Sequence, residues 1–149
     1  MPDTPFYDEL IMDHIKNARN YRVLTDASHG AAGSNPLCGD EMRVFLRIDG
    51  DRIADVGFQC TCCGIAMASA SIMSAMLIGT HQEEAELLLR DFKAFVEHAA
   101  PASQPISAEW RAVRDTLNRF PARLPCAALA WTTLQEALQQ PDRRYREQI

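Results

Sequence analysis

The residues of this sequence best suited to chemistry are its five cysteines, which gather in three short segments. Segment 35–40 holds Cys38 and also Asp40, segment 60–63 holds three cysteines, and segment 124–127 holds Cys126. Thiolates bind zinc and iron–sulfur clusters, and they also carry sulfur as persulfides or mixed disulfides. The sequence therefore predicts a protein that binds a metal through thiolates or handles sulfur.

One cysteine from each segment, together with Asp40, would give a complete tetrahedral ligand set for zinc. Cys38 and Asp40 would face the same side if their segment is extended. The segment Cys60-Thr61-Cys62-Cys63 is expected at a strand-to-helix junction and Cys126 at the start of the last helix, where the helix N-terminus stabilises a thiolate. The spacing alone does not distinguish zinc from an iron–sulfur cluster.

Composition limits the class of protein. The 149 residues, 47% hydrophobic and 23% charged, suit one compact domain over residues 1–149. The net charge of −5 argues against binding to nucleic acid. We find no apolar stretch long enough for a membrane and no secretory segment, and the cysteines are odd in number. A reduced cytoplasmic protein without disulfides is the expectation.

Hydrophobic periodicity and turn residues predict an α+β fold, in which a small antiparallel sheet packs against several helices. The expected strands join through the turn Asp49-Gly50-Asp51, and the expected helix starts are a capping box at Thr80–Glu83 and a cap at Ser107. The expected elements, in chain order, are a helix at 6–15, a loop at 18–36, strands at 42–48 and 53–59, helices at 65–78 and from the capping box to 98, a loop at 99–106, a helix from Ser107 to 117, an extended segment at 120–125 and a helix at 127–138.

These motifs resemble the U-type iron–sulfur cluster assembly family, which comprises IscU, the N-terminal part of NifU, and SufU. The resemblance covers nearly the whole chain in three ordered motifs. The matching residues are Ile11-Met12-Asp13-His14 with Arg19-Asn20, then Asn35-Pro36-Leu37-Cys38-Gly39-Asp40, then 58–71 with Cys63-Gly64-Ile65, and finally Cys126 with Ala130, Trp131 and Leu134.

Within that family the chain looks closest to SufU-like proteins. Pro125 stands where IscU-type scaffolds have a histidine, and the segment before Cys126 is long. The resemblance implies metal ligands at Cys38, Asp40, Cys63 and Cys126, with zinc as the metal. It also implies that the chain accepts persulfide sulfur from a SufS-type cysteine desulfurase and passes it to downstream iron–sulfur assembly proteins. Cys38, favoured over Cys126, is the expected sulfur acceptor, and Arg123 is expected to act at the site during ligand exchange.

Two alternatives remain open on the sequence. The same ligands could assemble a transient [2Fe–2S] cluster, or hold iron, in a scaffold protein. The chain could also be a zinc-stabilised adaptor without sulfur chemistry, so an enzymatic sulfurtransferase activity is left undecided.

One departure from the family concerns Cys60 and Cys62, which stand where the family usually has glycines. Either cysteine could be an alternative ligand, a resolving thiol or a second sulfur acceptor.

Overall fold

The computed structural model describes residues 9–36, 39–98 and 107–139. Its centre is an antiparallel sheet in the order β1-β2-β3, formed by β1 (His29–Asn35), β2 (Asp40–Asp49) and β3 (Arg52–Thr61). The predicted hairpin between the second and third strands is present, and Gly50 takes the positive φ of 63° that its turn requires.

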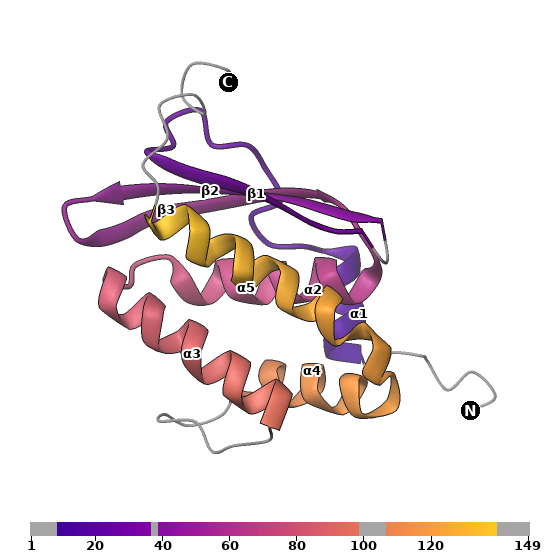
Figure 1. Cartoon of the computed structure of the whole chain (residues 1–149). Coiled ribbons are helices and arrows are strands. Elements are labelled where there is room, and N and C mark those ends of the chain that lie inside the picture. The colour runs from indigo at the N-terminus through magenta and orange to yellow at the C-terminus, as the bar shows by residue number, and fades with distance from the viewer. Residues whose placement is uncertain (1–8, 37–38, 99–106, 140–149) are drawn as a thin grey trace.

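Five α-helices complete the described part of the chain, and Figure 1 shows them gathered on one side of the sheet. Helices α2 (Gly64–Leu77) and α5 (Leu124–Gln139) pack directly on the strands. Helix α1 (Glu9–Lys16) packs on α2, while α3 (Gln82–His98) packs on α5 and α4 (Ala108–Arg119) on α3. The predicted α+β class is therefore confirmed.

The predicted loop at 18–36 is wrong for its second half, because residues 29–35 form β1, which pairs with β2. β-propensity does not predict the strand His29–Asn35, because its sequence HGAAGSN contains no Val, Ile, Thr, Phe, Tyr or Trp. Its small residues are explained by α5. A Cβ atom on Gly33 would lie 2.2 Å from Thr133 Oγ1, so the close approach of helix and strand needs a glycine here.

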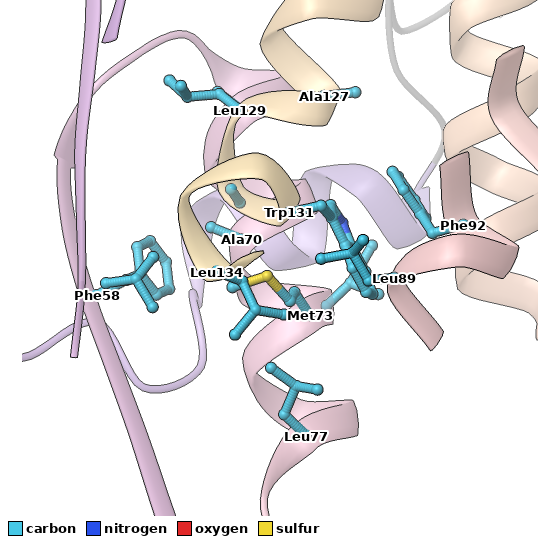
Figure 2. Packing of buried hydrophobic residues seen from close by; sticks show 14 of the residues in the cluster. Phe58, Ala70, Met73, Leu77, Leu89, Phe92, Ala127, Leu129, Trp131 and Leu134 are labelled. Carbon is cyan, nitrogen blue, oxygen red and sulfur yellow. The ribbon is translucent and has the colours of Figure 1, made fainter. Parts of the chain in front are cut away.

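The main core lies between the sheet and the helices. The alternating residues Val44, Leu46, Val56 and Phe58 are fully buried on the helix-facing side of the sheet. On the other side of α5, the Trp131 ring stacks on Phe92 with 4.4 Å between ring centroids. Figure 2 shows Trp131 and Leu134 of α5 between the sheet, represented by Phe58, and α3.

Phe45 interrupts the strand alternation because it belongs to a second, smaller core. It is buried on the outer face of the sheet together with Leu24 and Ala27, which lie in the segment before β1. Both faces of the sheet are thus covered at this position.

Two helix starts differ from the prediction in detail. The predicted capping box is shifted by one residue, since the backbone N–H of His81 donates to the Glu84 carboxylate at 3.1 Å, while the Thr80 hydroxyl donates to the Leu77 carbonyl at the end of α2. The cap at Ser107 is confirmed, because its hydroxyl accepts from Trp110 N–H.

The extended segment predicted at 120–125 is wrong. Residues Pro121–Arg123 form a short 3-10 helix (η1), and α5 begins at Leu124. Proline fits the first turn of a helix because it has no N–H to be satisfied there. The predicted loop at 99–106 and residues 6–8 of the first predicted helix lie outside the described residues. None of the described helices combines the length and apolar character that crossing a membrane requires.

Candidate functional site

Three of the side chains predicted as ligands meet at one end of the sheet. Asp40 is the first residue of β2, Cys63 precedes the first turn of α2, and Cys126 lies in the first turn of α5. One carboxylate oxygen and the two sulfur atoms all lie within 4.8 Å of one another. The folding of three segments that are distant in sequence therefore gathers two thiols and a carboxylate.

The fourth predicted ligand, Cys38, lies outside the described residues. The argument that placed it beside Asp40 assumed an extended segment, but Gly39 has a φ of +73°, which lies in the left-handed region. The chain turns at Gly39 between β1 and β2, so strand alternation does not relate Cys38 to Asp40.

Asp40 is almost fully buried, with 3% of its surface exposed, and its two carboxylate oxygens have different partners. Oδ1 accepts the backbone N–H of Cys63 at 3.1 Å, and Oδ2 lies 3.7 Å from Cys63 Sγ. Among the described residues no cationic side chain forms an ion pair with Asp40. A buried carboxylate without a cationic partner is costly, and a metal ion would remove that cost.

The donor types suit zinc, and one of the distances between them matches a tetrahedral zinc site. Two ligand atoms on one tetrahedral zinc ion lie about 3.5 to 3.8 Å apart, given the usual bonds to sulfur and oxygen. The distance of 3.7 Å from Asp40 Oδ2 to Cys63 Sγ falls in this range. The bond from Cys63 N–H to Oδ1 turns the other oxygen toward the sulfur, as outer-shell hydrogen bonds commonly do at metal sites.

The helix N-termini give the site a favourable potential for negative charge. Cys63 is the N-cap residue of α2, and no side-chain group caps that end of the helix. Cys126 is the third residue of α5 and fully buried. Both helices begin at the site, as the sequence predicted, so the positive ends of their dipoles lie beside the two cysteines.

Asn35 is a site residue that the sequence analysis did not assign. It is the last residue of β1, it is buried, and its Nδ2 amide donates to Cys126 Sγ across 4.0 Å. An N–H group directed at sulfur favours the thiolate form and fixes its position. The sequence could have indicated this role, because Asn35 stands three residues before Cys38 within the first cysteine motif.

A buried hydrogen-bond chain holds α2 and α5 together near the two thiols. The hydroxyl of Ser69 on α2 donates to the Ala127 carbonyl of α5 at 2.6 Å and accepts from Trp131 Nε1 at 3.1 Å. Ala127 directly follows Cys126, so this contact fixes the relative position of the two helix starts.

Arg123 lies on η1, directly before α5, and its side chain is exposed. It is close in sequence to Cys126 but does not belong to the group of three side chains described above.

The expectation that the cysteines are unpaired is wrong for two of them. Cys60 and Cys62 form a disulfide, with 5.5 Å between their Cα atoms, a separation that a disulfide readily spans. Cys63 and Cys126 take no part in this disulfide. The Cys60–Thr61–Cys62 segment reaches from the end of β3 to the link before α2, which confirms the predicted strand-to-helix junction.

His14 is a buried residue that lies outside the thiol–carboxylate group. Its Nδ1 atom lies 2.7 Å from Ser71 Oγ of α2. Burial, aided by the nearby positive charge of Arg19, lowers the pKa of His14 below its usual value of 6.5. The imidazole therefore belongs to the contact between α1 and α2.

Comparison with known proteins relates this chain to iron–sulfur cluster assembly proteins. In sequence, the chain is 35% identical over 89% of its length to the zinc-dependent sulfurtransferase SufU of Bacillus subtilis, and covers 88% of that protein. It is 32% identical over 89% of its length to the iron–sulfur cluster assembly scaffold protein IscU of Streptococcus pyogenes, covering 82% of it.

Among solved structures, one described as an iron–sulfur cluster assembly scaffold protein for the SUF system, from Fervidobacterium islandicum, superposes with a TM-score of 0.81 at 29% identity. The match covers 89% of this chain and 96% of that one. The N-terminal part of a NifU-like protein from Brucella abortus shares the fold, with a TM-score of 0.78 at 19% identity over 96% and 95% of the two chains. The sequence model of the NifU-like N-terminal domain matches residues 6–148, so the chain belongs to the NifU-like N-terminal domain family, which includes IscU and SufU.

Proposed function

We propose that this chain is a zinc-binding sulfur-transfer protein of iron–sulfur cluster biogenesis, which works in the cytoplasm and accepts persulfide sulfur from a SufS-type cysteine desulfurase. The observation that carries the proposal is the convergence of Asp40, Cys63 and Cys126, whose donor atoms all lie within 4.8 Å of one another. The similarity to a protein named zinc-dependent sulfurtransferase supports it.

The proposed zinc ligands are Asp40, Cys63 and Cys126, with Cys38 as the fourth. Bound zinc would keep the thiols deprotonated and protected from oxidation. The Asp40 carboxylate is a harder ligand than a thiolate, so it is the weaker partner for a borderline metal such as zinc.

The proposed transfer begins when the desulfurase persulfide approaches the site and one protein ligand is exchanged. The released thiolate attacks the outer sulfur of the persulfide, and the desulfurase cysteine leaves as a thiolate. Cys38 is the proposed acceptor in preference to Cys126, whose fully buried sulfur is poorly placed for a partner protein. Arg123, exposed beside the start of α5, is proposed to interact with the site while a ligand is exchanged.

Metal content and sulfur acceptance test this function together. Protein purified without added metal should carry about one zinc per chain, as a closed four-ligand site does, and Asp40→Ala should lose it. Asp91→Ala, which removes another buried carboxylate far from the three ligands in sequence, is the matched control. The chain should stimulate a SufS-type desulfurase, and Cys38→Ala should abolish that stimulation.

Other results would favour a different function. Zinc whose removal unfolds the chain, combined with no response of any desulfurase, would indicate an adaptor without sulfur chemistry. Intact stimulation by Cys38→Ala would leave sulfur transfer standing and assign acceptance to another cysteine.

A second candidate function is assembly of a transient [2Fe–2S] cluster on the same ligands, favoured by the similarity to proteins named IscU scaffolds. A carboxylate among thiolates would make such a cluster easy to release, because it is a harder ligand than a thiolate. Anaerobic reconstitution with iron and sulfide should then give a coloured protein whose cluster passes to an acceptor. A colourless protein under conditions that load an IscU scaffold would exclude this function.

A further inference from the structure

The Cys60–Cys62 disulfide lies directly beside the proposed sulfur-accepting site but forms no part of the ligand group. It joins residues only two positions apart at the end of β3. A disulfide stabilises a fold mainly by restricting the unfolded chain, and the restriction is small when the closed loop is this short. A role in stabilising the fold therefore does not account for the pair.

The segment that carries the pair is held in place by contacts that do not depend on the disulfide. The Tyr21 hydroxyl donates to the Cys60 carbonyl at 3.0 Å, and Cys60 pairs with Met42 in the sheet. At the other end, the N–H of Cys63 is bound to Asp40. Reduction of the disulfide would consequently leave two thiols at the same place beside the site.

The pair is also accessible from outside. Cys60 and Cys62 are both partly exposed, in contrast to the fully buried Cys126. Cys60 and Thr61 line an open cavity of about 540 Å³ at the sheet end that carries the site. Accessible disulfides are the ones that exchange readily with external thiols.

We propose that Cys60 and Cys62 form a redox-active dithiol that reduces sulfur delivered to the site to sulfide. The inference rests on the proposed sulfur-transfer function. Sulfur arrives in a persulfide at the oxidation level of elemental sulfur, whereas iron–sulfur clusters contain sulfide. Two electrons per sulfur atom are therefore needed, and a dithiol that becomes a disulfide supplies two.

The chemistry takes two exchange steps. The Cys62 thiolate attacks the outer sulfur of a persulfide on a site cysteine, and that cysteine leaves as a thiolate. The Cys60 thiolate then attacks Cys62 Sγ, which forms the Cys60–Cys62 disulfide and expels hydrosulfide with the bonding electron pair. The dithiol has lost two electrons and two protons, and the protons end on the hydrosulfide and on the regenerated site thiol.

The assignment of the two roles follows from their positions. Cys62 is the chain neighbour of Cys63, so their Cα atoms are about 3.8 Å apart, and it is the better first acceptor. Cys60 lies two residues farther along, partly exposed at the end of β3 and packed against the edge of the core, and it resolves the Cys62 persulfide. The disulfide seen in the structure is the end state of this reaction, and an external dithiol reductant would reset it by thiol–disulfide exchange.

The experiment follows sulfur through a single turnover. Pre-reduced, desalted chain is mixed with a SufS-type desulfurase and L-cysteine without any added reductant. Wild type should release about one hydrosulfide per chain, since one dithiol reduces one sulfur atom, and its Cys60–Cys62 peptide should lose two hydrogen atoms by mass spectrometry. The double variant Cys60→Ser/Cys62→Ser should keep its metal and gain a sulfur atom, but release less than about a tenth as much hydrosulfide.

The single variants separate the two roles. Cys60→Ser should accumulate a persulfide on Cys62, whereas Cys62→Ser should keep the added sulfur on a cysteine outside the 60–62 segment. Thr61→Ser, which alters the exposed residue between the two cysteines, should behave as wild type. Equal hydrosulfide release by wild type and the double variant, or a stable persulfide on wild type beside a reduced Cys60–Cys62 pair, would overturn the proposal.

Failure of the proposed function gives a different result from failure of this inference. If no form of the chain gains sulfur from the desulfurase, sulfur transfer from that enzyme is wrong. Glutathione persulfide then replaces the desulfurase as sulfur donor. Retention of the added sulfur to the same extent by wild type and the double variant would refute the dithiol role, whereas loss from wild type alone would support it.

Discussion

The two thiol-bearing sides of the site differ sharply in how they are built. One side, called here the closed side, carries Cys126, which is fully buried and accepts an amide N–H from Asn35. The start of its helix is held by the hydrogen bonds of Ser69, one of them to Trp131. On the open side, Cys60 and Cys62 are partly exposed, and their side chains form a disulfide with each other. The buried, anchored thiol and the accessible cysteine pair thus belong to different parts of one site, which implies that stability and the proposed sulfur chemistry can be altered separately.

The largest effect is expected on the closed side from Trp131→Ala. The indole is fully buried and stacked on Phe92, so its removal leaves a large cavity and should cost about 3–5 kcal/mol of unfolding free energy. Urea unfolding followed by circular dichroism measures the loss. Leu87→Ala, which truncates a side chain that is 47% exposed, should stay within about 0.5 kcal/mol of wild type. Similar losses for the two variants would contradict the importance of the closed side.

A smaller loss is expected when only the hydrogen bonds of that side are removed. Ser69→Ala leaves the buried Trp131 Nε1 without its acceptor and should cost about 1–3 kcal/mol in the same assay. Thr132→Ala removes an exposed hydroxyl from α5, the helix that carries Trp131, and serves as the control. Since Ser69 also holds the helix start beside Cys126, its variant should weaken zinc binding as well. Unchanged zinc affinity together with reduced stability would show that the anchor does not position the ligand.

The pH dependence of stability should show the effect of the buried His14. Because burial lowers its pKa in the folded protein, the unfolded chain binds its proton more readily. The contribution of His14 is therefore complete above the unfolded value of 6.5 and is lost as the pH falls below it, by at most about 1.4 kcal/mol per pH unit.

His14→Asn tests this dependence while keeping an amide near Ser71. The stability difference between wild type and the variant should shrink as the pH is lowered from 7.5 toward 5. Some dependence should remain in the variant, because burial lowers the pKa of His29 too. A difference that is constant with pH would rule out a neutral, buried His14.

The smallest effect on stability is expected on the open side. In reduced, metal-free protein, Cys60→Ser/Cys62→Ser should change the unfolding free energy by less than about 1 kcal/mol, as partly exposed substitutions usually do. Cys126→Ser, the buried counterpart, should cost more because it places a hydroxyl in an apolar setting. If the double variant proved the less stable, the division into a closed and an open side would be wrong.

The sequence placed the three residues of the thiol–carboxylate group more closely than it predicted the strands of the sheet. Local sequence patterns at the element boundaries predicted that Cys63 and Cys126 stand at helix starts. In the structure both lie beside Asp40. Strand β1 was missed because its residues are selected by the close approach of α5 at Gly33, a tertiary contact that local propensity does not report. The contact from Asn35 to Cys126 spans 91 residues and depends on that same strand.

The disulfide was missed for a different reason. An odd cysteine count and adjacent cysteines argued against pairing, but pairing depends on the distance between particular Cα atoms, which is 5.5 Å for Cys60 and Cys62. The starts of α3 and α5 were misplaced by one and three residues, because a threonine or a proline near a helix start is compatible with more than one boundary.

The three donor segments become available in a fixed order as the chain is synthesised. Asp40 and Cys63 belong to the hairpin and the helix that follows it, whereas Cys126 arrives only with α5. Because the earlier part of a chain leaves the ribosome first, an incomplete chain lacks the last donor and one of the two helices on the sheet. If the proposed function holds, metal binding is then confined to finished molecules, and a chain truncated before α5 should neither retain the proposed zinc nor compete for a sulfur donor.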